Sequence, residues 1–322
     1  AVDEHLDTTV AIKEYYPRQI AGRTDATLEV RPHTDRETDE FEDGLQQFME
    51  EGRTLARFDH ASVVDVNSYF EENGTGYLVM DYYEGQSLAD RLAEAGGRLP
   101  EEEAVGYIHD VLDGLGPVHD AGVLHRDIDP QNIYLRADED GQVGRRAILI
   151  DFGAAREAIG QKSQSLDVIL KPGYAPPEQY RPSGNHGPWT DIYACAATLY
   201  RSLTGLKPPE STERAKSDEL IPPREIREVI SFETDLAVRK GLAVHPEQRP
   251  ASAREFAQLI SRTETAEGPT QTPPSPETEP PIRVEGTSGT SSDQSGEAST
   301  APTAATATGA TVPGTPVGAS DG

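Results

Sequence analysis

The chain has 322 residues, with one Cys, 29 Lys and Arg and 56 Asp and Glu, so its formal net charge is −27. This charge argues against binding to nucleic acid or to an anionic membrane surface, both of which need a basic protein surface. One Cys excludes an intrachain disulfide or a Cys-based zinc site. We find no signal peptide and no apolar run of membrane-spanning length, so we expect a cytoplasmic chain with no membrane segment. So large a negative charge also fits a solubility adaptation to high salt.

Apolar content divides the chain into two regions. Residues 263–322 contain no Leu, Phe, Tyr, Trp or Lys, and they carry 8 acids and 1 base. Such a composition cannot bury enough apolar surface to offset the entropy of ordering, which predicts a disordered tail rich in Thr, Pro, Ser, Gly and Ala. The remaining body, 1–262, is long enough for one large domain or for two lobes around a hinge.

The first part of the body is predicted to contain strands and one helix. Val10-Ala11-Ile12-Lys13 reads as a strand in which Ala11 and Lys13 share one face. Apolar residues between about 38 and 58 recur at three- and four-residue steps, as in an amphipathic helix.

A hairpin and a hinge follow. Strands are predicted near 63–70 and 76–82, and Asn73-Gly74-Thr75-Gly76 between them is typical of a tight turn. After a hinge near 81–85 the pattern becomes helical.

The second part of the body is predicted to be mostly helical. Pro100 followed by three Glu residues marks the start of a helix. Short strands are expected at 133–135 and 148–150, and Ser252-Ala253-Arg254-Glu255 is a capping box before the last helix. The predicted fold class is therefore α+β, with a small β-rich part before a larger helical part.

Three motifs occur in a fixed order. His125-Arg126-Asp127-Ile128-Asp129-Pro130-Gln131-Asn132 fits H-R-D-x-x-x-x-N, and Asp151-Phe152-Gly153 begins 19 residues after Asn132. Lys13 closes a V-A-I-K strand. This set resembles the protein-kinase family. The phrases at 173–180 and 189–194 are most similar to bacterial eukaryotic-type (Hanks-type) serine/threonine kinases.

The resemblance covers 1–262 and implies a two-lobed kinase fold. It places the N-lobe at about 1–82, the hinge at 81–85 and the C-lobe at about 86–262. It also implies transfer of the ATP γ-phosphoryl group to Ser or Thr hydroxyls of protein substrates, with Mg²⁺ or Mn²⁺.

The resemblance assigns a role in binding phosphate to Lys13. A compact cation suits the α- and β-phosphates, and the small Ala11 beside it would let adenine approach. An acid must hold Lys13 in place, and the family pattern favours Glu51, with Glu50 as the competing choice.

Other site residues follow from the same resemblance. Asp127 would accept the hydroxyl proton, and Asn132 and Asp151 offer hard oxygen ligands for the metal. Met80 would take the gatekeeper position. The backbones of Asp81 and Tyr83 would then bond the adenine edge.

Several matches are expected to be structural. Glu178 and Arg249 resemble a buried ion pair that anchors the activation segment, and Asp191 resembles the acid that braces the catalytic loop. Cys195 is expected to be a small core residue rather than a nucleophile. No ligand role is assigned to His60, His119 or His245.

The first departure from the family pattern is the missing glycine-rich phosphate loop. The family has two strands before V-A-I-K, whereas only nine residues precede Val10. The expectation is therefore a kinase truncated at its N-terminus, with an incomplete N-lobe and weak nucleotide binding.

The second and third departures concern charge. Asp129 stands where serine/threonine kinases usually carry Lys, and Lys171 stands where they usually carry Thr in the substrate-docking loop. Our hypothesis is that the cation has been relocated, with Lys171 reaching back to Asp127 and Asp129 as a catalytic group. The alternative is a Lys171 that points to solvent.

Ser163 and Ser165 of the activation segment are candidate phosphorylation sites, with plain loop serines as an equal alternative. Two alternatives to an active protein kinase stay open. They are a pseudokinase that binds nucleotide or partners without turnover, and a small-molecule kinase, against which the full activation segment argues. The resemblance leaves open a dimer for autophosphorylation, and a full-length protein anchored in a membrane through a segment not present here.

Overall fold

The computed structural model describes residues 1–4, 6–23, 27–138, 143–152, 170–181 and 184–260. The chain divides into two units, Ala1–Pro269 and Thr270–Gly322, and the described residues all belong to the first. The predicted tail at 263–322 and the serines at 163 and 165 lie outside the described residues, as does Gly153.

An antiparallel sheet forms the first part of the chain. Its strand order is β1-β2-β6-β5, with β1 Val2–Asp3, β2 Thr8–Glu14, β5 Val66–Glu72 and β6 Thr75–Asp81. The predicted hairpin is confirmed, because β5 and β6 are joined by Asn73 and Gly74, with φ of 51° and 69°. Two consecutive residues with positive φ make the type I′ turn that matches the twist of paired strands.

A short second hairpin was not predicted from the sequence. Strands β3 Ala21–Arg23 and β4 Val30–Pro32 pair with each other. Each strand has three residues and one of them ends in Pro, so neither carries a clear strand pattern. The hairpin is held by burial instead, because Ala21 and Val30 belong to the hydrophobic cluster of this lobe.

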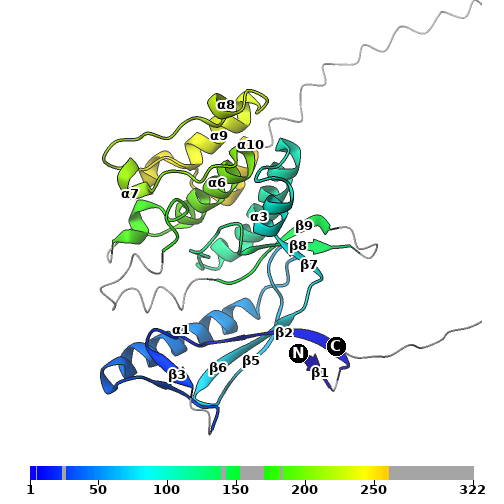
Figure 1. Cartoon of the computed structure of the whole chain (residues 1–322), viewed down its shortest axis with the longest axis vertical. Helices are drawn as coiled ribbons and strands as arrows, with labels where there is room; N and C mark the ends of the chain where they lie inside the picture. Colours follow the sequence, from blue (N-terminus) through cyan, green and yellow to red (C-terminus); the bar gives the residue numbers. More distant parts are fainter. Residues whose placement is uncertain (5, 24–26, 139–142, 153–169, 182–183, 261–322) are drawn as a thin grey trace, which may run out of the picture. The chain divides into compact units, whose positions relative to one another are not determined.

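One long helix packs against the sheet. After a 3-10 turn, η1 (Asp35–Glu37), helix α1 spans Thr38–Leu55 and contacts β5 and β6 (Figure 1). It ends three residues before the predicted boundary. Its buried Phe41 and Phe48 join Tyr15 and Leu78 in the cluster of this lobe.

The second lobe begins with a small sheet of order β7-β8-β9. Its strands are β7 Gly85–Ser87, β8 Ile133–Ala137 and β9 Val143–Leu149. The sequence predicted helix directly after residue 85. This was wrong, because strand β7 comes before the first helix of this lobe. The next helix starts only at Leu88, where Ser87 and Asp90 form a capping box.

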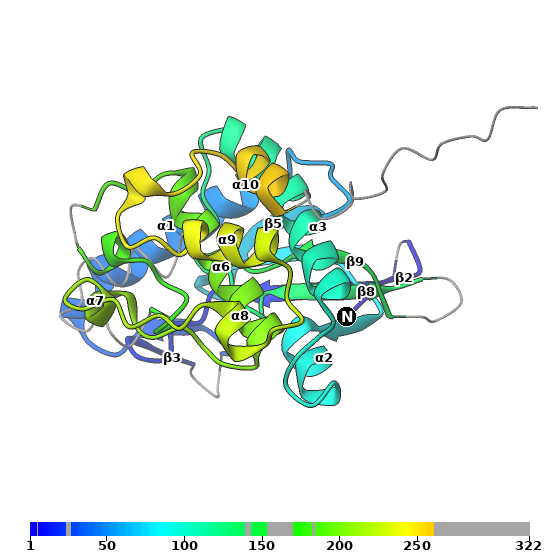
Figure 2. The same ribbon diagram turned by 90° about the horizontal axis from the view of Figure 1, so that it is seen from above.

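The other regular elements described in this lobe are helices (Figures 1 and 2). Their bounds are α2 Leu88–Glu94, α3 Glu101–Asp120, η2 Pro177–Tyr180, α6 Pro188–Thr204, α7 Ser211–Arg214, α8 Pro223–Ile226, α9 Phe232–Gly241, η3 Pro246–Gln248 and α10 Ala253–Ile260. The predicted start after Pro100 is confirmed. Half of the predicted capping box is present, because the Ser252 hydroxyl accepts a hydrogen bond from the Glu255 N–H, whereas the Glu255 carboxylate bonds Ala251.

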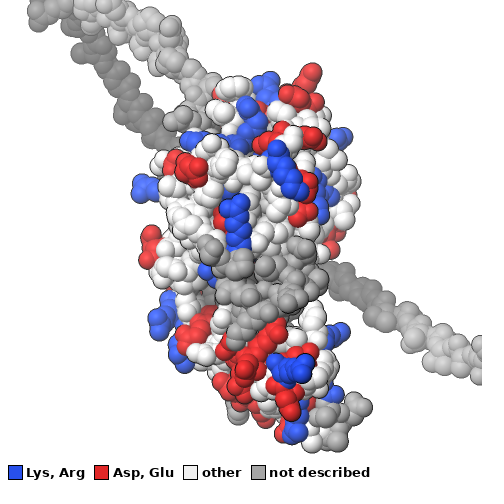
Figure 3. All heavy atoms as spheres, turned by 90° about the vertical axis from the view of Figure 1, so that its left-hand side faces the viewer, with Lys and Arg blue, Asp and Glu red and all other residues white. Residues whose placement is uncertain are grey.

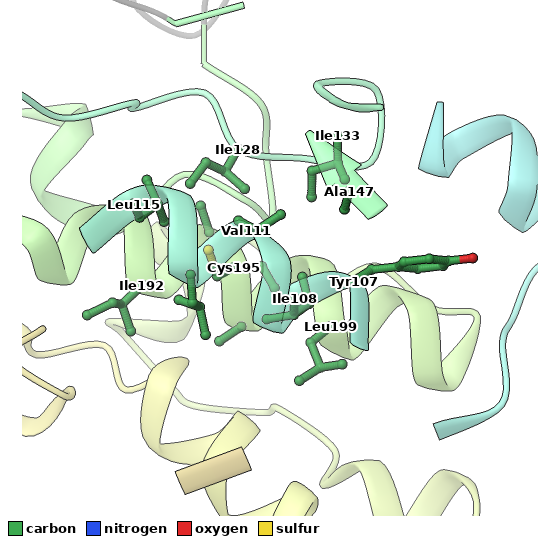
Figure 4. Packing of buried hydrophobic residues seen from close by; sticks show 14 of the residues in the cluster. Tyr107, Ile108, Val111, Leu115, Ile128, Ile133, Ala147, Ile192, Cys195 and Leu199 are labelled. Atoms are coloured by element: carbon green, nitrogen blue, oxygen red, sulfur yellow. The ribbon is translucent and has the colours of Figure 1, made fainter. Parts of the chain in front are cut away.

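The core of the second lobe lies between α3 and α6. Figure 4 shows Val111 and Leu115 of α3 facing Cys195 of α6, and all three side chains are fully buried. Burial raises the pKa of the Cys195 thiol well above its usual value, so the thiol stays protonated. The expectation of a small core residue at Cys195 is confirmed.

Strand β6 ends at Asp81 and β7 begins at Gly85, so the connection between the two lobes falls within the residues that the sequence assigns to a hinge. Met80, next to the hinge, packs against the hydrophobic clusters of both lobes. Among the described residues, no helix has the length and apolarity needed to cross a bilayer.

Candidate active site

Lys13 lies between two carboxylates that come from different elements. Its Nζ is 3.3 Å from Glu51 Oε1 on α1 and 3.1 Å from Asp151 Oδ1, just after β9. Glu50, the competing choice, is exposed and pairs with Arg53 at 3.1 Å instead. The register of β2 explains the contact, because Lys13 pairs with Leu78, whose side chain is buried against α1.

Charge keeps Lys13 an ammonium. Burial lowers the pKa of Lys13, but Glu51 and Asp151 outweigh that effect and hold the pKa above its usual value of 10.5. The Nζ also lies 5.7 Å from the centre of the Phe48 ring, which adds a cation–π attraction. The side chain thus presents a fixed positive charge.

Hydrogen bonds within the catalytic-loop motif hold Asp127. The Asn132 Nδ2 donates to the backbone oxygen and to Oδ2 of Asp127, both at 2.7 Å. The Asp127 N–H donates to His125 Nδ1 at 3.3 Å, and His125 Nε2 lies 3.1 Å from the Ile150 carbonyl. A neutral imidazole with its proton on Nε2 satisfies both contacts of His125.

The loop and Asp151 are directly connected. The Ile150 N–H donates to the Asn132 carbonyl at 3.0 Å, so the residue before Asp151 is tied to the residue that holds Asp127. Asp151 itself has a φ of 59°, a left-handed value that non-glycine residues rarely adopt. Lys13, Glu51, Asp127, Asn132 and Asp151 are thereby brought together.

Asp191 braces the loop, as the sequence suggested. This carboxylate, on α6, is fully buried and accepts from the N–H groups of His125 at 2.9 Å and Arg126 at 2.7 Å. Burial alone would raise the pKa of Asp191, yet its hydrogen bond with His119 and the nearby charges hold the pKa below 3.8. Arg126 has a φ of 65°, and these bonds fix that strained backbone.

The contact predicted for Lys171 is present. Its Nζ is 3.2 Å from Asp127 Oδ1 and also contacts Asp129 Oδ2. Asp129 is 2% exposed, and its other carboxylate oxygen accepts from the Gln131 N–H at 2.6 Å. The alternative of a solvent-directed Lys171 is therefore wrong.

The predicted anchor of the activation segment is also present. Arg249 Nη1 and Nη2 contact the Glu178 carboxylate at 2.7 and 3.1 Å, and both residues are buried. Thr190 donates to the same carboxylate at 3.1 Å. This arrangement fixes the chain just after the proposed docking loop.

At the hinge, two backbone groups already have partners. The Asp81 N–H donates to the Asp65 carbonyl at 3.0 Å, and the Tyr83 carbonyl accepts from the Tyr134 hydroxyl at 3.2 Å. Ala11 pairs with Met80 across the sheet. The small side chain and the gatekeeper candidate therefore lie beside each other next to the hinge.

Three contacts of this site were missed from the sequence. His119 Nε2 lies 2.8 Å from Asp191 Oδ2, although no role was assigned to this His. The Gln179 side-chain amide donates to the Arg126 carbonyl at 2.8 Å. The turn made by Asp129 over Gln131 could have been predicted, because Asp-Pro commonly starts such a turn.

Comparison with known proteins agrees with this geometry. Residues 22–265, more than half of the chain, match the protein kinase domain. The chain belongs to the protein kinase family. The match begins after Lys13, so the assignment of that residue depends on the contacts described above.

Bacterial serine/threonine kinases are among the relatives. The chain is 31% identical over 236 residues to serine/threonine-protein kinase PknB of Mycobacterium leprae, covering 69% of this chain and 36% of that protein. It is 36% identical over 165 residues to PknL of Mycobacterium tuberculosis, covering 51% and 39%. The chain thus spans little more than a third of the length of these curated relatives.

Solved structures show the same fold. PpkA-294 in its apo form has a TM-score of 0.72 and 37% identity, covering 80% of this chain and 89% of that one. The PknI kinase domain of Mycobacterium tuberculosis has a TM-score of 0.56 and 25% identity, covering 78% and 83%. The two-lobed kinase fold predicted from the sequence is confirmed.

Proposed function

We propose that this chain is the catalytic domain of a serine/threonine protein kinase, which transfers the γ-phosphoryl group of ATP to hydroxyls of protein substrates. The observation that supports this most is the pairing of Lys13 with both Glu51 and Asp151, beside a catalytic loop that presents Asp127. Phosphoryl transfer needs charge neutralisation and alignment of the attacking group, and these residues supply both.

Each residue has a distinct role in this proposal. Lys13 binds the α- and β-phosphates, and Glu51 holds it there. Asp127, which two hydrogen bonds from Asn132 orient, accepts the proton from the attacking hydroxyl. Lys171 contacts Asp127 Oδ1 at 3.2 Å.

Asn132 and Asp151 are the proposed metal ligands. Asn132 uses its Nδ2 for both contacts with Asp127, so its Oδ1 is the atom proposed to ligate, and the Asp151 side chain is 38% exposed. Among the described residues no cluster of three His, Cys, Asp or Glu side chains could hold a metal alone. One carboxylate and one amide oxygen fit Mg²⁺ or Mn²⁺, which bind through few protein oxygens together with substrate phosphates. When bound, the ion neutralises phosphate charge.

The hinge is the proposed site for adenine. Since the Asp81 N–H and the Tyr83 carbonyl are already bonded, the Asp81 carbonyl and the Tyr83 N–H are the pair proposed to meet the adenine edge. Ala11 and Met80 would lie against the ring. A cytoplasmic location and autophosphorylation in a dimer belong to the same proposal.

Phosphate transfer from radiolabelled ATP to a Ser/Thr peptide library and to the chain itself tests the proposal. Asp127→Asn is expected to lower the rate at least 100-fold, since it removes the base but keeps the size of the side chain. Glu51→Gln is expected to lower it about 10-fold or more, because Lys13 loses one of its two anchors. The neighbouring Glu50→Gln is the matched control.

Two results would contradict the proposal. The first is an unsubstituted chain that binds ATP but transfers no phosphate, which would leave the pseudokinase alternative. The second is a Glu51→Gln variant as active as Glu50→Gln.

A further inference from the structure

Two carboxylates of the catalytic loop share one ammonium that comes from a distant part of the chain. Lys171 Nζ lies 3.2 Å from Asp127 Oδ1 and contacts Asp129 Oδ2. The side chains of Asp127 and Asp129 are 9% and 3% exposed, whereas that of Lys171 is 27% exposed. The two acids are therefore mostly buried, and the more exposed cation reaches them from the 170–181 segment.

The turn that carries Lys171 is rigidly held. The N–H groups of Tyr174 and Ala175 donate to the Lys171 carbonyl at 3.0 and 3.1 Å. Gly173 has a φ of 90°, and a Cβ there would lie 2.7 Å from the Pro208 carbonyl oxygen, so only glycine fits. The Ser211 hydroxyl fixes the Ala175 carbonyl at 2.8 Å.

The segment that carries Lys171 also contacts the backbone of the catalytic loop. The Gln179 amide donates to the carbonyl of Arg126, the residue before Asp127. Downstream, Glu178 is locked to Arg249. When the 170–181 segment is docked in this way, the Lys171 side chain meets both acids.

The charge balance of the loop depends on this contact. Asp127 and Asp129 are close enough to share one ammonium, so without it two negative charges face each other in a poorly solvated place. Asp129 cannot simply turn away, because its Oδ1 is bonded to the Gln131 N–H. Removal of Lys171 would therefore disturb the orientation of Asp127.

We infer that Lys171 is a positioning residue for Asp127, and that the docked 170–181 segment supplies it to the catalytic loop. Displacement of this segment then removes Asp127 from its working arrangement. This rests on the proposed kinase function. In this arrangement the segment that receives the protein substrate also completes the electrostatics of the site. Binding of a protein substrate at the docking loop is thereby coupled to the working arrangement of Asp127.

A double-substitution cycle tests the electrostatic part. Lys171→Met is expected to lower the rate at saturating ATP about 100-fold, while the KM for ATP changes less than about 3-fold because Lys13 and Asp151 are untouched. Adding Asp129→Asn removes the uncompensated charge but keeps the size of the side chain. The double variant is therefore expected to be at least about 5-fold faster than Lys171→Met alone. Lys216→Met, on the exposed surface of the same lobe, is the control.

Amide deuterium exchange tests the coupling without any need for activity. Lys171→Met is expected to raise exchange both in 125–132 and in 170–181, and Lys216→Met in neither. The inference is overturned if Lys171→Met changes neither segment, if its rate stays within twofold of the parent, or if Asp129→Asn gives no relief. An inactive parent chain contradicts the proposed function instead, and the exchange result still decides the coupling.

Discussion

His125 shows how one side chain links several parts of the site. Its ring lies 4.3 Å from the centre of the Phe152 ring, and its two nitrogens contact the Asp127 N–H and the Ile150 carbonyl. Burial lowers the pKa of His125 below its ordinary 6.5 and outweighs the opposing charges of Asp191 and Asp127. The neutral form is therefore the one that organises the loop.

This predicts a loss of stability in acid. Because the folded state depresses the pKa of His125, the unfolded state binds more protons below pH 6.5, and stability falls as the pH drops from 6.5 toward the folded pKa. The thermal midpoint is expected to fall over this range, and to fall less in His125→Asn. A titration of the His125 ring by NMR checks the cause directly, and a midpoint of protonation at or above 6.5 would contradict it.

At the scale of elements, the packing of α1 against β6 sets the position of Glu51. Gly52, the next residue, is buried, and a Cβ there would lie 2.2 Å from Leu78 Cδ2. Leu78 is itself 1% exposed and packed against Phe48, so it has little room to move. The glycine lets the helix approach the strand that runs beside β2 and Lys13.

Gly52→Ala is therefore expected to destabilise the fold by about 1–3 kcal/mol through overpacking. Gly106→Ala is the matched control, since Gly106 lies in the exposed face of α3 with no atom within 4 Å of the added carbon. There the better helix propensity should stabilise by about 0.5–1 kcal/mol. Urea unfolding measures both, and equal midpoints for the two variants would be inconsistent with the close approach of α1 and β6.

The long periodic elements were predictable from the sequence, whereas the short ones were not. The helix at 38–55 and the hairpin at Asn73-Gly74 have strong local patterns. Strands β3, β4 and β7 have three residues each, and tertiary burial or pairing rather than local propensity stabilises them. The resemblance to the kinase family similarly indicated that Lys13 contacts Glu51 and that Lys171 contacts Asp127, and both contacts are present. The contacts of His119 and Gln179 depend instead on how α6 and the 170–181 segment pack.

For the whole molecule, the dominant electrostatic property is the net charge of −27. Acids cluster before and within the first turn of α1, at Asp35, Glu37, Asp39 and Glu40, and Figure 3 shows acidic side chains gathered on the lower part of the face it displays. Such a charge destabilises the folded state through self-repulsion.

Added salt is therefore expected to stabilise the protein. Raising KCl from 0.1 to 1 M shortens the screening length from about 10 to about 3 Å, and Tm should rise by about 2–4 °C for each kcal/mol of relieved repulsion. Differential scanning fluorimetry measures the shift, with a neutral osmolyte at matched osmolality as the control. A Tm that stays constant or falls with KCl would show that self-repulsion is not significant.

The buried Cys195 has a practical consequence for spectroscopy. Because its thiol is enclosed between α3 and α6 and stays protonated, the folded chain has no thiol that reacts readily with maleimide dyes. A cysteine introduced at any exposed position becomes the single labelling point without removal of the natural one. Two such positions, one in each lobe, would let energy transfer between dyes measure whether the distance between the lobes changes when ATP is added.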